Sequence, residues 1–240
     1  MKLLCLLLLL WRSSLPGARN FDGVDDNADC GTLADAFLTE NGAVTISAWI
    51  FPDTLGESSL GKIIGKGSVS WGLQATNRVL FRVVGSTILV RATANSSLTL
   101  GVWSHVLVTW DGSVTATNVH IYINGTEPSY ASSISGVSPT DNSGDELAIG
   151  ASDNAGSNDF DGSIAELGVW NVALSANEIT SLNTGAPVAA TRNTSLMGYW
   201  PLWGASTTEA DYGSTTKHNC TVTGAVLANH SPTGPFIGSR

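Results

Sequence analysis

The acidic and nucleophilic side chains are where chemistry would be expected in this 240-residue sequence. A retaining glycosidase needs two carboxyl groups roughly 5 Å apart, which alternate positions on one strand can supply. No closely spaced triplet of acids of that kind occurs, and the seven glutamates are scattered from Glu40 to Glu209. No serine or cysteine nucleophile motif accompanies the histidines, which are His105, His120, His218 and His230. The sequence therefore predicts a protein that is not an enzyme.

Calcium binding is the second kind of chemistry that the acids allow. Asp22, Asp25 and Asp26 lie close together in an opening strand and the turn that follows it. Calcium takes roughly six to eight oxygen ligands, often from aspartates and loop carbonyls. The alternative is a solvated loop or a turn in which an Asp side chain accepts a hydrogen bond from nearby backbone. Calcium is the one cofactor that the sequence leaves open.

The N-terminus has the pattern of a secretory leader over residues 1–18. Lys2 supplies a positive start, residues 3–11 form an apolar run, and residues 12–18 form a short polar tail. The run is shorter than the roughly 20 residues that cross a bilayer. Cleavage after Ala18 leaves nine basic and 20 acidic residues, a net charge of −11. We expect a secreted or cell-surface protein that does not bind nucleic acid. Sequons for glycosylation occur at Asn95, Asn124, Asn193, Asn219 and Asn229.

Short segments of alternating apolar and polar residues recur along the chain, which is typical of half-buried strands. Asp111-Gly112 and Asn124-Gly125 follow two of these segments, and such dipeptides favour tight turns between antiparallel strands. Ser175 and Glu178 form a capping-box pattern that predicts one helix over residues 175–182. Residues 132–144 are predicted to form a loop. Strands are predicted at residues 44–51, 62–64, 69–74, 78–84, 87–92, 103–110, 119–123 and 147–150.

Three stretches resemble one family. The pattern W-x-H-V-x-x-T-W-D-G at residues 103–112, followed by Y-I-N-G, resembles the concanavalin A-like jelly roll of laminin-G-like and pentraxin-like domains. Residues 149–182 resemble the last strand and short helix of that family, and residues 21–52 resemble its opening strands. The resemblance implies an all-β fold, a two-sheet antiparallel jelly-roll sandwich with one short helix. It implies no single function, because this fold serves lectins, adhesion modules, glycanases and structural proteins.

The resemblance also bears on metal and sugar sites. A structural calcium site of the family often takes an Asp from a pattern like G-x-I-D-E, but here Ala165 stands at that place. A pentraxin-like site uses acids after the strand at 147–150, which Asp153, Asn154 and Asp159 match in part. Four tryptophans fall at core or sheet positions of the family, namely Trp49, Trp103, Trp110 and Trp170. Three are less constrained, namely Trp71, Trp200 and Trp203.

The C-terminal tail is out of its usual order. Residues 196–227 resemble the segment that opens the domain in many family members, so the chain looks circularly permuted. We divide the chain into a leader (1–18), a laminin-G-like sandwich (19–185) and a tail (186–240). The family places the tail element beside the strand that ends at Cys30, so the resemblance implies a disulfide between Cys30 and Cys220. The alternative is two buried thiols.

Two functions fit these observations. In the first, which is slightly favoured, the protein is a self-assembling structural subunit of a fibre or surface layer, and its tail adds as a strand to the next copy of a homo-oligomer or filament. In the second, it is a lectin-like or adhesion module that binds an extracellular glycan, with or without calcium. The residues expected to fill pockets on a neighbour, or to cover an edge of their own sandwich, are Tyr199, Trp200, Leu202 and Val222.

Overall fold

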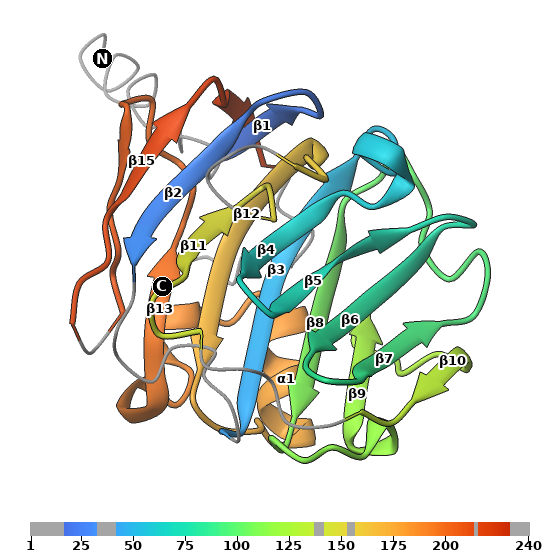
Figure 1. Ribbon diagram of the computed structural model, residues 1–240. Helices are drawn as coiled ribbons and strands as arrows, with labels where there is room; N and C mark the ends of the chain where they lie inside the picture. Colours follow the sequence, from blue (N-terminus) through green and yellow to red (C-terminus); the bar gives the residue numbers. More distant parts are fainter. Residues whose placement is uncertain (1–16, 33–41, 137–141, 153–156, 214–215, 231–240) are drawn as a thin grey trace, which may run out of the picture.

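The protein folds as a sandwich of two antiparallel sheets in this computed structural model (Figure 1), which confirms the predicted jelly-roll fold. The structure describes residues 17–32, 42–136, 142–152, 157–213 and 216–230. The leader predicted over residues 1–18 lies outside these ranges except for Gly17 and Ala18, which belong to the first strand. No described helix combines the length and the apolar composition that a membrane-spanning helix requires.

One sheet has seven strands among the described residues, and β12 lies near its middle. The order is β16-β1-β12-β3-β8-β9, and β13 also pairs with β12. These strands are β1 (Gly17–Asp22), β3 (Val44–Pro52), β8 (Ser104–Trp110), β9 (Val119–Ile123), β12 (Asp161–Trp170), β13 (Leu196–Trp200) and β16 (Val226–Asn229). The Asn124-Gly125 turn after β9 has positive φ angles of 50° and 73°, as the hairpin prediction requires.

The other sheet has nine described strands in the order β10-β7-β6-β5-β4-β11-β2-β15-β14. Their bounds are β2 (Asn27–Thr32), β4 (Lys62–Lys66), β5 (Val69–Gln74), β6 (Arg78–Val84), β7 (Ile88–Thr93), β10 (Tyr130–Ile134), β11 (Glu146–Ile149), β14 (Thr208–Glu209) and β15 (Cys220–Thr223). The predicted loop over 132–144 is wrong at its start, because Ser132, Ser133 and Ile134 pair with β7. Two consecutive serines before Ile134 give no alternating signal, so the neighbouring strand decides the conformation of this segment.

The main core lies between the two sheets and is built from large side chains on their facing surfaces. Trp71 and Trp200, which the sequence left less constrained, are fully buried there together with Phe21, Phe81 and Phe160. Trp49 and Trp103, expected at core or sheet positions, are only half-buried. Burial of large aromatic side chains on this scale is a leading contribution to the stability of any sandwich.

A smaller apolar cluster covers the outer face of the seven-stranded sheet. The helix α1 (Ala176–Asn183) places Ile179 and Leu182 against Leu107 and Trp170. The predicted capping box forms at its start, where the backbone N–H of Ser175 donates to Glu178 Oε2 at 2.8 Å. Central strand β8 is therefore buried on both faces, under the main core on one side and under this cluster on the other.

The tail pairs with its own domain in this structure. Strand β13 pairs with β12, β15 pairs with β2, and β16 pairs with β1, so the tail contributes to both sheets. Figure 1 shows red β15 beside blue β2, and orange β13 beside β12 in the lower part of the view. The tail therefore folds back on its own sandwich, whereas the slightly favoured prediction was that it adds as a strand to the next copy. Cys30 and Cys220 form the expected disulfide between β2 and β15.

Candidate functional site

A depression of about 410 Å³ lies on the outer face of the nine-stranded sheet, over β4 to β7. Strand register creates it. Lys62 lies opposite Gly72, which lies opposite Leu80, and in the next row Ser70 lies opposite Arg82, which lies opposite Val90. Because side chains on a strand alternate between faces, these side chains share the outer face. Gly72 contributes no side chain, which lets the backbone of Gly61 and Lys62 lie against β5, since a Cβ at Gly72 would come within 2.4 Å of the Gly61 carbonyl oxygen.

Ser152 and Asn158 form one wall of this depression, and Asn158 Nδ2 donates to Ser152 Oγ at 3.1 Å. Gly65 allows Ser152 to approach β4, because a Cβ at Gly65 would lie only 2.4 Å from the carbonyl oxygen of Ser152. The complete lining is polar (Lys62, Ser68, Ser70, Gln74, Arg82, Ser152, Asn158) and apolar (Leu60, Leu80, Val84, Ile88, Val90), with Gly67 at one end.

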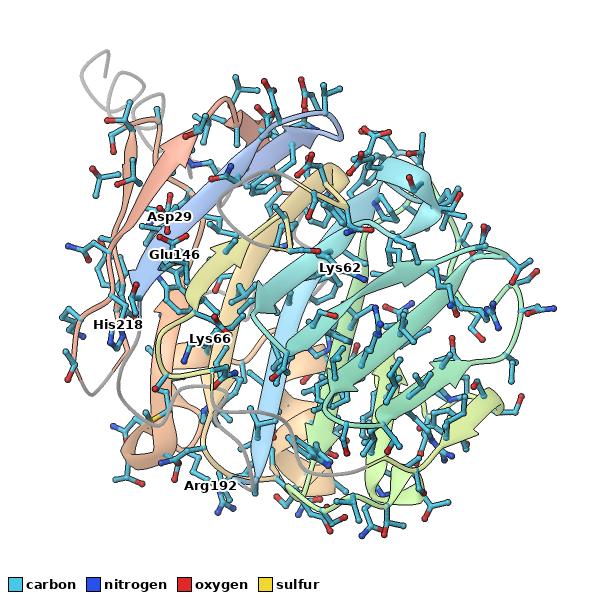
Figure 2. The ribbon with its side chains drawn as sticks, in the orientation of Figure 1. Asp29, Lys62, Lys66, Glu146, Arg192 and His218 are labelled. Atoms are coloured by element: carbon cyan, nitrogen blue, oxygen red, sulfur yellow. A yellow bond between two sulfur atoms is a disulfide. The ribbon has the colours of Figure 1, made fainter. Side chains whose placement is uncertain are left out.

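Positive charge distinguishes the depression from the rest of this acidic protein. Lys62 is only 5% exposed, and its pKa is lowered to about 8, mainly by burial and also by the nearby charge of Arg82. None of the described lining residues is an acid. Figure 2 shows Lys62 on β4, whereas Asp29 and Glu146 lie near each other over β2 and β11, towards the other edge of the same sheet. Lys66, at the far end of β4, is fully buried and does not line the depression.

The three aspartates proposed as calcium ligands do come together. Carboxylate oxygens of Asp22, Asp25 and Asp26 lie within 4.8 Å of one another. Asp22 Oδ1 accepts a hydrogen bond from Val24 N at 2.9 Å, and Asp26 Oδ2 accepts one from Asp22 N at 2.9 Å. Burial and the two neighbouring carboxylates raise the pKa of Asp26. The oxygen-only donor set suits a hard cation, and the backbone hydrogen bonds equally match the Asx-turn alternative.

The second predicted metal group is only partly accounted for. Asp153 and Asn154 lie outside the described residues. Asp159 is fully buried, and it does not belong to the cluster of acids that converge within the described part of the chain. The structure therefore does not bring Asp159 together with Asp22 and Asp25.

Aromatic side chains in the tail have two different environments. Trp200, Leu202 and Val222 are buried in the main core of their own sandwich, and Tyr199 is buried in the smaller outer cluster. Trp203 and Tyr212 remain 49% and 52% exposed, with ring centroids 6.4 Å apart in an edge-to-face arrangement. Of the three tryptophans that the sequence left unconstrained, only Trp203 is thus available at the surface.

Sequence reasoning missed the residues of the depression. Lys62, Ser70, Gln74 and Arg82 lie in three predicted strands, and the predictions followed acids and tryptophans instead. A signal was present, because Val69–Gln74 alternates apolar residues with small or polar ones and Arg78 and Arg82 lie four residues apart on one face of the next strand, but only the register shows that Ser70 and Arg82 adjoin.

Comparison with known proteins agrees with this architecture. Residues 23–180 match the family described as the concanavalin A-like lectin/glucanases superfamily. That stretch is more than half of the chain, and the protein belongs to this superfamily, as its resemblance to laminin-G-like domains predicted. No curated protein matches the chain.

Several solved structures are similar. A Bacteroides ovatus protein to which carbohydrate binding has been provisionally attributed aligns with a TM-score of 0.64 and 21% identity, over 90% of this chain and 60% of that one. The chain thus spans less than two thirds of that protein. The CBM40 of the Ruminococcus gnavus IT-sialidase, bound to α2,3-sialyllactose, aligns with a TM-score of 0.50 and 12% identity, over 69% of this chain and 97% of that one. At such identities the likeness concerns the fold.

Proposed function

We propose that the protein is a non-catalytic, lectin-like module that binds carbohydrate in the depression over β4 to β7. One observation carries the proposal: hydroxyl and amide groups of Ser70, Gln74 and Asn158 line the same hollow as the aliphatic side chains of Leu80 and Val90. A sugar presents hydroxyl groups at its edges and C–H groups on its faces. Ligand sites commonly combine an apolar lining with a few such polar groups.

Family and compartment support this proposal. The superfamily includes lectins, and the Bacteroides ovatus and Ruminococcus gnavus structures are both described in terms of carbohydrate. The Cys30–Cys220 disulfide fits an exported protein, because disulfides persist mainly in oxidising compartments. We therefore place the protein outside the cell, where glycans are available as ligands.

Glycan-array binding followed by calorimetry tests the proposal. Gln74→Ala and Ser70→Val remove hydrogen-bonding groups from the depression, and each should weaken binding of the best array ligand by about tenfold. Thr221→Val is the matched control, because Thr221 is exposed on β15 of the same sheet and outside the depression. Circular dichroism checks that each variant remains folded. Failure to bind any glycan on a broad array would refute the proposal.

Calcium is a separate question that the same titration answers. None of Asp22, Asp25 and Asp26 lines the depression. Glycan binding should therefore have the same affinity in EGTA as in calcium. Binding that EGTA and Asp25→Asn both abolish would move the sugar site to the aspartate cluster and favour a calcium-dependent lectin.

A further inference from the structure

Two cations in the depression have no described partner. Lys62 is almost fully buried and Arg82 is half-buried, and neither makes a side-chain hydrogen bond or ion pair within the described part of the chain. Burying a charge costs free energy unless the charge is paired and hydrogen-bonded. Arg19 shows the usual solution, since its buried guanidinium lies 3.2 Å from the Glu209 carboxylate. Arg91 is stabilised in a different way, because its guanidinium carbon lies 3.4 Å from the centroid of the Tyr130 ring.

The two cations line the same depression and lie near each other, because the charge of Arg82 contributes to the lowered pKa of Lys62. Lys62 lies opposite Gly72, and Arg82 lies opposite Ser70, which is two residues before Gly72 on β5. Gly72 has no side chain and Ser70 has a small one, so β5 places no large side chain opposite either cation. A guanidinium offers paired N–H donors that match the oxygens of a carboxylate or a sulfate, and a lysine adds a point charge. The Ser70 hydroxyl supplies a further donor.

Two acids among the described residues, Asp145 and Glu57, contact residues at the edges of this site. The Asp145 side chain lies against Gly67, where its carboxylate would overlap any added Cβ, and Asp145 is exposed. Glu57 accepts a hydrogen bond from the backbone of Asn158. The whole chain carries a net charge of −9, so general electrostatic attraction would not bring an anion here. An anion would therefore be held here by specific pairing with Lys62 and Arg82.

We propose that the ligand is an acidic glycan, and that Lys62 and Arg82 bind its anionic group. This inference rests on the proposed function, because it assumes that the depression is the sugar site. Carboxylate and sulfate share the chemistry that these side chains recognise. The apolar positions Leu80 and Val90 would contact the sugar ring that carries the group.

Calorimetry with three probes tests this inference. A hyaluronan oligosaccharide carries carboxylates, its carboxyl-reduced form is neutral, and a keratan sulfate oligosaccharide carries sulfate without carboxylate. Lys62→Met and Arg82→Gln should each weaken binding of the preferred acidic probe by about tenfold or more. Arg78→Gln is the matched control on β6, because Arg78 lies outside the depression, and it should change the affinity less than about twofold. Raised salt should weaken the acidic probe alone.

The outcomes separate this inference from the proposed function. Stronger binding of hyaluronan or of keratan sulfate identifies which anionic group is recognised. Equal affinity for neutral and acidic probes, unchanged in Lys62→Met and Arg82→Gln, overturns the inference and leaves the sugar site standing. Acidic probes that bind the variants as well as the wild type overturn it also, because the anion is then held elsewhere. Absence of binding to all three probes and to a broad array overturns both proposals.

Discussion

Lys62 retains its charge at a position where that charge opposes folding. Burial lowers its pKa from 10.5 to about 8, so the folded protein holds this proton less tightly than the unfolded chain. For a base with a lowered pKa, stability is lost as the pH falls from about 10.5 to about 8 and stays low below that range. A residue kept under this penalty fits a role in binding, since strained or unpaired groups recur at functional sites.

Lys62→Met is therefore expected to make the protein more stable while it weakens anion binding. At pH 7 the free energy of unfolding should rise by roughly 1–3 kcal/mol. Urea denaturation measured between pH 7 and pH 10 should show this gain shrinking above about pH 8, because the wild-type lysine then loses its charge on folding. Arg78→Gln should show no such gain. A Lys62→Met protein less stable than wild type at every pH would contradict the account.

His105 is a second residue with a pH signature. Its side chain is buried in the outer layer of the seven-stranded sheet, its Nε2 lies 2.8 Å from Ser47 Oγ, and burial lowers its pKa to about 3. In the unfolded chain His105 takes up a proton near pH 6.5, whereas in the folded protein it stays neutral until the pH approaches about 3. The stability that neutral His105 contributes is thus present above about pH 6.5 and is lost as the pH falls towards about 3.

Urea unfolding of wild type and of His105→Gln at several pH values between 7.5 and 4.5 measures how the stability contributed by His105 changes with pH. The stability advantage of the wild type should shrink by up to about 1.4 kcal/mol for each pH unit below about 6.5. His120→Gln is the control, because His120 is exposed and pairs with Glu127 at 2.8 Å. An advantage that stays constant with pH would show that His105 titrates normally.

Individual strands were largely predictable because alternation reflects a physical requirement. Strand β5 (Val69–Gln74) and strand β6 (Arg78–Val84) have the predicted bounds, since each presents one face to the core and one to solvent. Strand β10 escaped prediction because its only strong apolar residue, Ile134, faces outward and is exposed. The candidate site could not be predicted from the sequence for a different reason. Its residues adjoin only after β4, β5 and β6 pair, and register is a property of the assembled sheet.

The buried ion pair between β1 and the tail is expected to hold those elements together. Glu209 accepts hydrogen bonds from Arg19 and from the backbone of Leu202, and both charged side chains are almost fully buried. Glu209→Gln keeps an acceptor for Leu202 but leaves the Arg19 charge unpaired, so the free energy of unfolding should fall by about 3 kcal/mol. Chemical denaturation measures this loss.

A matched variant separates burial from pairing as its cause. Arg192→Gln breaks the pair between Arg192 and Glu178, whose side chains are partly exposed, and should cost less than about 1 kcal/mol. An equal fall in the free energy of unfolding in the two variants would mean that burial does not make the loss of the Arg19–Glu209 pair more costly than the loss of an exposed pair.

At the scale of the whole molecule, the sequence could not choose between a tail that folds back and a tail that exchanges. Residues 183–194 are long enough for either path, and the apolar residues of β13 and β15 would bury the same surface in both. The structure pairs both strands within one chain, so the edges that exchange would have used are already covered.

The disulfide provides a direct test of this arrangement. Cys220 lies in the tail and Cys30 in the opening strand, so a tail that folds back joins two cysteines of one chain, whereas an exchanged tail joins two chains. Unlabelled and ¹⁵N-labelled protein are mixed, reduced and unfolded, then refolded under oxidising conditions at high concentration. Mass spectrometry of the linked Cys30 and Cys220 peptides should find only pairs of matching label. Non-reducing electrophoresis should show a single-chain band, because the bond closes inside each sandwich. Mixed-label pairs as frequent as matched ones would establish exchange and restore the assembling subunit.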